Sequence, residues 1–274
     1  MASDSVSPTA HYTGHVWLRN GLSHEALGTI EGQAMFAAAE PLMLARRLTR
    51  EPTLEQYLLA RHLVVDELLE EQVESGRVGQ VIEIAAGMSP RGWRFTERYP
   101  DLVYVETDLP AMAERKRRAL DDIGDRPPGH RVAELDALRD DGPASLGAVA
   151  GELDPERGLG VITEGLLSYL DDGAMLGLWR RIAGVLERFD DGRYVFDLGV
   201  GALGRDLRAR AFRVALGAFV RGQVHEHFPD DEDAIEALHE AGFADARIVR
   251  PDERHTSQIA RLGSAGPGQR TTSV

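Results

Sequence analysis

The chain has 274 residues, of which 31 are Lys or Arg and 45 are Asp or Glu, so its formal net charge is −14. This acidic balance argues against nucleic acid and anionic membrane surfaces as partners, because both are bound by clustered basic side chains. The sequence contains no cysteine, which excludes disulfides, thiolate catalysis and cysteine-ligated metal sites.

The N-terminal segment has neither the basic region nor the apolar region of a signal peptide, and no apolar run is long enough to cross a bilayer. We therefore expect a cytoplasmic protein. The first 52 residues are predicted to be helical and irregular. A long helix follows, because Thr53 and Gln56 have the spacing of a capping box and Gly76 is a suitable end. Apolar residues recur along this helix every three or four positions, and Arg61 is the exception within that stripe.

From residue 80 onward, short apolar runs alternate with helical patterns. Strands are predicted at 80–86, 102–107, 131–135, 160–163, 193–198, 244–250 and, on a weaker pattern, 257–262. Helices are predicted at 91–99, 110–124, 171–188, 205–220 and 231–241. This alternation predicts an α/β fold with a doubly wound, mostly parallel sheet that is covered on both faces.

Acidic residues stand at the ends of four successive predicted strands, which are the positions where open parallel sheets bind ligands. Asp108, after the second strand, could accept hydrogen bonds from both hydroxyls of a ribose. The small-residue turn around Gly87 lets backbone N–H groups approach a ligand closely. Arg91 could then hold a ligand carboxylate. The set fits a nucleoside that also carries an amino acid.

The first of these motifs resembles that of class I S-adenosylmethionine-dependent methyltransferases, and within them the leucine carboxyl methyltransferase family, which includes polyketide O-methyltransferases. The family motif, Gly-Ala-Gly followed by Asp-Thr-Arg and a further Arg, is matched by residues 85–87, by Ser89-Pro90-Arg91 and by Arg94. Ala85 replaces the first family glycine, and Ser89 and Pro90 replace Asp-Thr. Alanine allows close approach but not every glycine conformation.

Two further motifs follow in the family's order. Its Glu-x-Asp-x-Pro motif with a downstream Lys is matched by residues 106–110 and by Lys116, and its Glu-Gly-x-Leu-x-Tyr-Leu motif is matched by residues 164–170. The resemblance covers about residues 80–200. Lys116 itself is interpreted as part of a solvated basic helix face with Arg115 and Arg118.

The resemblance implies a Rossmann-like sheet of the seven-stranded methyltransferase type with an N-terminal helical extension. We place the methyltransferase domain at residues 53–262, after a helical lid at residues 1–52. Residues 263–274 are predicted to be a flexible tail, because their Gly, Ser, Thr and Pro composition buries too little apolar surface to offset ordering. The resemblance implies S-adenosylmethionine as cofactor, S-adenosylhomocysteine as product, and methyl transfer to a carboxylate or hydroxyl oxygen of a small molecule, ranked above a protein carboxylate. The lid, with His11, Tyr12, His15, Trp17 and Arg19, is expected over the acceptor pocket; the alternative is a flap that only packs against the sheet.

The resemblance also implies the cofactor site. Its expected residues are Glu83, Ala85, Gly87, Arg91, Asp108, Leu109, Asp136, Ala137 and Glu164. Gly87 would line the methionine, Arg91 or Glu164 would hold its charged groups, Asp108 would bind the ribose and Asp136 would lie by the adenine. The alternatives are a helix cap for Asp108, a turn residue for Asp136, a solvated helix start for Arg91 and a structural acid for Glu164.

A carboxylate acceptor is ionised at pH 7 and needs no base, whereas a hydroxyl acceptor would need one. The candidates for that base are Tyr169, His225 and His227, with His15 as a further possibility. A metal site at His225 and His227 lacks an evident third ligand, so none is expected. The expected partners are a small-molecule acceptor and a second copy in a homodimer, with neither nucleic acid nor membrane.

Two other functions stay open. The departures at Ala85, Ser89 and Pro90 leave room for a non-catalytic, regulatory nucleotide-binding protein. Residues 199–204 read Gly-Val-Gly-Ala-Leu-Gly, which is formally the dinucleotide fingerprint of a nicotinamide-dependent oxidoreductase. That motif follows the fifth predicted strand rather than the first, which disfavours this alternative.

Overall fold

The computed structural model describes residues 8–48, 53–199, 225–250 and 271–273. Their strands form one sheet in the order β3-β2-β1-β4-β5-β7-β6. The strand bounds are β1 Gln80–Ile84, β2 Val103–Asp108, β3 His130–Glu134, β4 Leu159–Thr163, β5 Gly192–Asp197, β6 Arg247–Val249 and β7 Thr271–Ser273. This arrangement confirms the predicted α/β, Rossmann-like fold class.

Five strands, β1 to β5, make the parallel part of the sheet. Ile82 of β1 lies opposite Val105 of β2 on one side and Val161 of β4 on the other. The chain order reverses between β1 and β4, and this switch point is where a doubly wound sheet opens a crevice for a ligand. The two short strands β6 and β7 extend the parallel part, with β7 antiparallel to β5.

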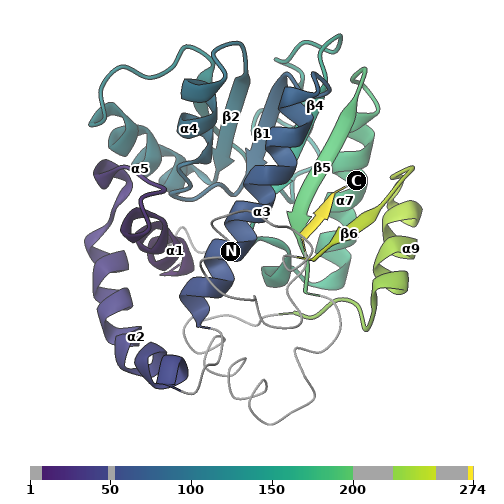
Figure 1. The fold of residues 1–274 in the computed structure, drawn as a ribbon. Coiled ribbons are helices and arrows are strands. Elements are labelled where there is room, and N and C mark those ends of the chain that lie inside the picture. The colour runs from purple at the N-terminus through teal and green to yellow at the C-terminus, as the bar shows by residue number, and fades with distance from the viewer. Residues whose placement is uncertain (1–7, 49–52, 200–224, 251–270, 274) are drawn as a thin grey trace.

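Helices cover both faces, which explains why β1 and β4 are buried at every position and read as continuous apolar runs. One face packs against α6 (Leu146–Ala150), α7 (Asp172–Leu186) and α9 (Asp231–Ala241), with Trp179 at its centre. The other packs against α3 (Leu54–Glu74) and α4 (Arg91–Arg98). Helix α5 (Pro110–Asp121) follows β2. Figure 1 shows α3 and α7 on opposite sides of the sheet.

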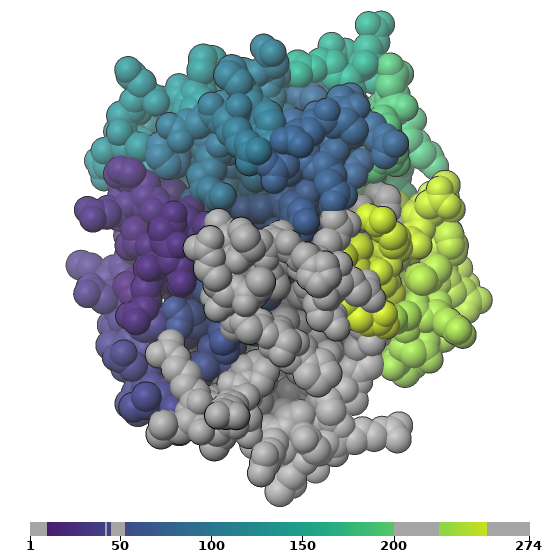
Figure 2. Space-filling view, viewed as in Figure 1, coloured from purple at the N-terminus to yellow at the C-terminus, as the bar shows by residue number. Residues whose placement is uncertain are grey.

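The predicted start of α3 is confirmed: the Thr53 side chain accepts from the Gln56 N–H, and the Gln56 side chain accepts from the Thr53 N–H. The chain leaves the helix through Gly76, whose φ of 74° favours glycine. Before α3 lie α1 (Pro8–Arg19) and α2 (Ile30–Leu48), as the predicted helical extension requires. Helix α1 lies at the side of the sheet to which the parallel strands point, and α2 packs on α1 (Figures 1 and 2).

The predicted flexible tail is wrong for residues 271–273. Thr271–Ser273 forms β7, which pairs with Val195–Asp197 of β5 and with β6. The polar composition misled the prediction, because β7 is held by backbone pairing with strands on both of its sides, and β-branched Thr fits a strand well. The predicted helix at 205–220 and strand at 257–262 lie outside the described residues. None of the helices in the described ranges combines the length and apolar composition needed to cross a membrane.

Candidate functional site

The turn after β1 carries two residues in the left-handed region. Ala85 has φ 55° and Gly87 has φ 52°. Ala85 therefore takes the conformation that the replaced glycine would adopt freely, which costs roughly 1 kcal/mol for an L-residue. The turn is tied down on both sides, because Ala86 N–H donates to the Thr107 carbonyl at 2.9 Å and Ser89 N–H donates to the Ala86 carbonyl at 2.9 Å.

Asp108 ends β2 directly beside this turn. Its Oδ2 accepts from Gly87 N–H at 2.7 Å and its Oδ1 accepts from Leu109 N–H at 2.8 Å. Burial raises the pKa of this carboxyl, and the two backbone donors only partly offset that effect. The N-cap of α5 is Leu109, whose side chain makes no capping hydrogen bond. Asp108 accepts from the N–H of this N-cap residue and so does not cap α5 in the usual way. A carboxylate has about four lone-pair sites, so two remain for a ligand.

Arg91 is buried completely and is the centre of an ionic network. Its Nε donates to Asp66 Oδ1 at 2.6 Å, its Nη1 to Glu83 Oε1 at 2.6 Å and its Nη2 to Glu164 Oε2 at 2.5 Å. The interpretation as a solvated helix start is wrong. Each guanidinium nitrogen already has a carboxylate partner, so Arg91 acts here by holding Glu83 and Glu164 in place, not by offering a free N–H to a ligand.

The network places its acids in different electrostatic states. Burial raises the pKa of Glu83, and the neighbouring Arg91 does not fully offset it. Burial would also raise the pKa of Glu164, but the positive charges of His62, Arg91 and Arg61 outweigh it and hold that pKa well below its usual range. Glu164 is therefore a carboxylate at the end of β4, beside the switch point between β1 and β4.

Arg61 extends the network to the carboxyl ends of β4 and β5. From α3, its Nε donates to Glu164 Oε1 at 3.0 Å and its Nη1 donates to Asp197 Oδ2 at 3.2 Å. Its Nη2 has no hydrogen-bond partner among the described residues and lies 3.1 Å from where a Cβ on Gly165 would stand. Asp197 Oδ1 also accepts from Gly165 N–H at 2.6 Å, which joins the ends of β4 and β5.

The sequence analysis missed four members of this network: Arg61, His62, Asp66 and Asp197. Two signals could have found some of them. A lone arginine in the apolar stripe of a buried helix needs buried acidic partners. Asp197 is a fifth acid at a strand end, in the same place as the four that were noticed.

At the end of β3, Asp136 forms a turn: its Oδ1 accepts from Leu138 N–H at 3.0 Å and its N–H donates to the Ala144 carbonyl at 2.9 Å. The turn alternative for Asp136 thus describes its local bonds, and its place beside an adenine stays a prediction. Leu109 and Leu138 are 39% and 48% exposed at the ends of β2 and β3, beside the half-buried Ala137.

The interpretation of Lys116 as a solvated residue is wrong. It is 1% exposed, and its Nζ lies 2.8 Å from Glu106 Oε1, while His130 Nε2 lies 2.8 Å from Glu106 Oε2. Lys116 shares the buried stripe of α5 with Met112 and Leu120, whereas the neighbouring arginines lie on the outer side. Four consecutive basic residues suggest an exposed segment, but the 3.6-residue period of the helix places Lys116 on its buried side.

The N-terminal helix α1 packs on the turn after β1 through small residues. A Cβ on Gly87 would lie 3.3 Å from Ala10 Cβ, and a Cβ on Gly14 would lie 3.3 Å from Met88 Cβ. The Trp17 ring lies 4.6 Å from that of His62 in the ionic network. Helix α1 therefore lies beside the predicted cofactor turn, and its role as a lid over the acceptor stays a prediction.

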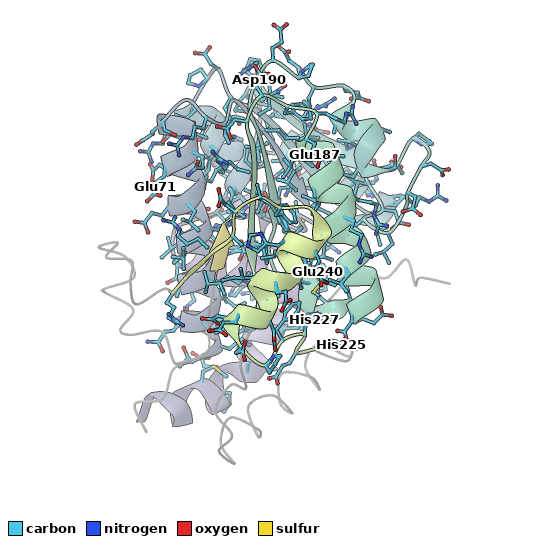
Figure 3. The ribbon with its side chains drawn as sticks, turned by 90° about the vertical axis from the view of Figure 1, so that its right-hand side faces the viewer. Glu71, Glu187, Asp190, His225, His227 and Glu240 are labelled. Atoms are coloured by element: carbon cyan, nitrogen blue, oxygen red, sulfur yellow. The ribbon has the colours of Figure 1, made fainter. Side chains whose placement is uncertain are left out.

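Two of the candidate catalytic residues, His225 and His227, lie against the short helix that contains the third, Tyr169; the His225 N–H donates to the Ser168 carbonyl at 2.8 Å. Tyr169 ends the short helix Leu167–Tyr169 and is 36% exposed. His227 Nδ1 lies 2.7 Å from Asp172 Oδ1 and its Nε2 lies 3.0 Å from the Leu167 carbonyl oxygen, so both ring nitrogens are engaged. The His225 ring stacks on that of His227, with centroids 6.0 Å apart (Figure 3).

Comparison with known proteins gives a family and a fold. The sequence profile of the leucine carboxyl methyltransferase family matches residues 22–183. A protein of Mycobacteroides abscessus named as an S-adenosyl-L-methionine-dependent methyltransferase is 35% identical over 153 residues, which cover 56% of this chain and 46% of that protein. The chain spans about half the length of the curated relatives it matches.

Two solved structures resemble nearly the whole chain. One is a DUF574 family protein from Streptomyces avermitilis, with TM-score 0.64, 14% identity and coverage of 97% of this chain and 95% of that one. The other is described as a methyltransferase from Thermobifida fusca, with TM-score 0.61, 15% identity and coverage of 99% and 95%. At these identities the likeness is one of fold.

Proposed function

The chain belongs to the leucine carboxyl methyltransferase family, and from this premise we propose that it transfers a methyl group from S-adenosylmethionine to an oxygen of a small molecule. The observation that carries the proposal is the bond between Gly87 N–H and Asp108, which joins the carboxyl ends of β1 and β2 next to the switch point of the sheet. It presents a carboxylate and a left-handed glycine turn to the same crevice. The names of the relatives agree with this cofactor.

The ribose is assigned to Asp108. The two backbone donors fix the carboxylate, and each oxygen keeps a lone pair for one of the two ribose hydroxyls. The adenine then lies toward the exposed side chains of Leu109 and Leu138, which offer apolar surface at the ends of β2 and β3. Asp136, two residues after the end of β3, would accept a hydrogen bond from the exocyclic amine of the adenine.

The methionine end is assigned to the rim of the ionic network. Glu164 is held as a carboxylate and can accept from the ammonium group. Among the described residues of the network, Arg61 has a nitrogen without a hydrogen-bond partner, so its Nη2 can donate to the methionine carboxylate. Arg91 supports this end indirectly, because it fixes the position of Glu164.

Methyl transfer needs the acceptor oxygen, the methyl carbon and the sulfur in line. The oxygen–carbon bond forms as the carbon–sulfur bond breaks, and S-adenosylhomocysteine leaves. A carboxylate acceptor reacts as the anion. A hydroxyl acceptor gives its proton to a base, and His225 fits this role better than His227, because the described residues engage both ring nitrogens of His227 and neither of His225.

Calorimetry with S-adenosylhomocysteine tests the cofactor site. We expect binding by the native chain and at least tenfold weaker binding by Asp108→Ala, because charge-assisted hydrogen bonds contribute about 1.5–3 kcal/mol each. Asp122→Ala, at the exposed end of α5, is the matched control and should bind normally. Binding of NADH but not of the adenosyl ligand would instead favour the oxidoreductase.

Transfer of a labelled methyl group to matched carboxylic acids and phenols tests the acceptor class. His225→Gln should slow transfer to phenols and leave transfer to carboxylates unchanged, because only the phenols need a base. Binding of the cofactor with no transfer to either class would favour the regulatory alternative.

A further inference from the structure

Helix α2 is apolar on two opposite sides. Its inner side packs on α1 through Phe36 and Met43, which are 6% and 5% exposed. Gly32 permits this close packing, because a Cβ there would lie 2.2 Å from the His11 carbonyl oxygen. The outer side carries Ile30 and Leu44, which are 83% and 56% exposed. A helix that is apolar all round is normally buried, yet the outer side has no partner among the residues that the structure describes.

The exposed apolar residues of the outer side form one seam. They are Ile30, Ala34, Ala37, Pro41 and Leu44, with steps of four, three, four and three residues. A mean step of 3.5 residues keeps side chains on one line of a helix and is the spacing of helices that pair lengthwise. The seam runs for about 21 Å at 1.5 Å per residue. Helix α2, which carries the seam, lies at the left of the molecule in Figures 1 and 2.

We propose that the outer side of α2 pairs with the same helix of a second copy of this chain, antiparallel about a twofold axis at Ala37. A twofold interface requires a patch that is complementary to itself. The seam meets this condition, because large residues stand at both ends and small ones in the middle. Reversal places Ile30 of one copy against Leu44 of the other and brings the two Ala37 residues face to face, where alanines allow close approach.

The charges beside the seam favour the antiparallel arrangement. Glu40 and Gln33 flank the same edge of the seam, and reversal places Glu40 of one copy near Gln33 of the other, so an amide faces each carboxylate. On the other edge, Glu31 is already paired with Arg115 of its own chain, with Arg115 Nη2 3.0 Å from Glu31 Oε2. The two helix dipoles are also opposed.

A single pair of short helices buries less surface than the interfaces of stable dimers, which bury about 1,200–2,000 Å². We therefore expect a reversible dimer whose population rises with protein concentration. The inference concerns a surface away from the proposed cofactor site and does not depend on the proposed activity.

Because the chain has no cysteine, single introduced cysteines report the pairing directly. Ala37→Cys should oxidise to a disulfide-linked dimer, since a twofold axis brings these positions within disulfide reach. Leu44→Cys alone should stay monomeric on a denaturing gel, whereas a mixture of Ile30→Cys and Leu44→Cys should give the linked dimer. Ala244→Cys, on an exposed loop before β6, is the matched control and should not crosslink.

Sedimentation of the full chain provides the second test. The native protein should shift toward dimer as its concentration rises, and Ala37→Arg should abolish the shift because two arginines would face each other at the axis. Ala244→Arg should behave like the native chain. Self-crosslinking of Leu44→Cys would show parallel pairing and overturn the proposal. A native chain that stays monomeric throughout, with no crosslink at Ala37→Cys, would also overturn it and leave a different protein as the occupant.

Discussion

Two buried ionic clusters flank the first two strands of the sheet, and they differ in how they end. The Arg91 network continues to the carboxyl ends of β4 and β5; its members are Arg61, His62, Asp66, Glu83, Arg91, Glu164 and Asp197. The Glu106 cluster, made of Glu106, Lys116 and His130, is sealed, with each residue at most 4% exposed.

This difference separates two uses of buried charge. In the sealed cluster every charged group has a partner inside the protein, so the cluster stabilises the fold. In the Arg91 network the inner members fix Glu164 and Arg61, and Arg61 Nη2 has no hydrogen-bond partner among the described residues. Burying a charge requires partners in both cases, but only the open network has capacity left for a ligand.

The largest expected effect is that of Arg91→Met. It leaves Asp66, Glu83 and Glu164 buried without their shared cation, and removal of one partner from a buried ion pair costs about 3–5 kcal/mol. The free energy of unfolding in urea should fall by this amount, or the variant should fail to fold. Arg94→Met is the control, because the Arg94 side chain is 32% exposed and, among the described residues, pairs only with Asp66. Equal losses for the two variants would contradict the central role of Arg91.

Lys116→Met should remove about 3 kcal/mol from the free energy of unfolding, because Glu106 keeps only His130 and the Gly92 N–H as partners. Its affinity for S-adenosylhomocysteine should stay within about twofold of native when measured on the folded protein. Arg118→Met, at a side chain that is 72% exposed, should change neither quantity. A large loss of affinity in Lys116→Met would mean that the sealed cluster also shapes the crevice.

The sealed cluster should also make stability depend on acid. Burial alone would raise the pKa of Glu106, but Lys116 and His130 outweigh it and place that pKa at about 2. The resulting stabilisation is present above the unfolded pKa of about 4.5 and is lost as the pH falls toward 2. Between pH 4.5 and 3 the native chain should lose about 2 kcal/mol more than Glu106→Gln, which cannot titrate. Parallel curves for the two proteins would contradict the lowered pKa.

The smallest expected effect is at the turn after β1. Ala85→Gly should raise the free energy of unfolding by about 0.5–1 kcal/mol, because glycine adopts the φ of 55° without strain. Ala111→Gly, within α5, should have the opposite sign. Thermal unfolding of both variants measures the contrast, and a loss of stability at both positions would mean that Ala85 is unstrained.

The local elements of this protein could be predicted from the chain alone. The capping residues of α3, the acidic start of α9 and the apolar runs of β1 to β6 depend on short-range propensity and periodicity, which neighbouring residues determine. The alternation of strands and helices then restricts the topology to a parallel, doubly wound sheet. The acids at the strand ends follow from that order, because parallel strands place their carboxyl ends at one edge.

Tertiary structure alone decided which charges meet. Arg91 reads as a ligand-binding residue until α3 brings Asp66 against it from 25 positions away. Lys116 reads as a surface residue until β2 places Glu106 opposite its side of α5. Thr271–Ser273 reads as a tail until β5 offers it an unpaired edge. Periodicity predicts which side of an element is buried, but not which residue of another element packs against that side. An ionic contact depends on that residue, because only a charged partner offsets the cost of removing a charge from water.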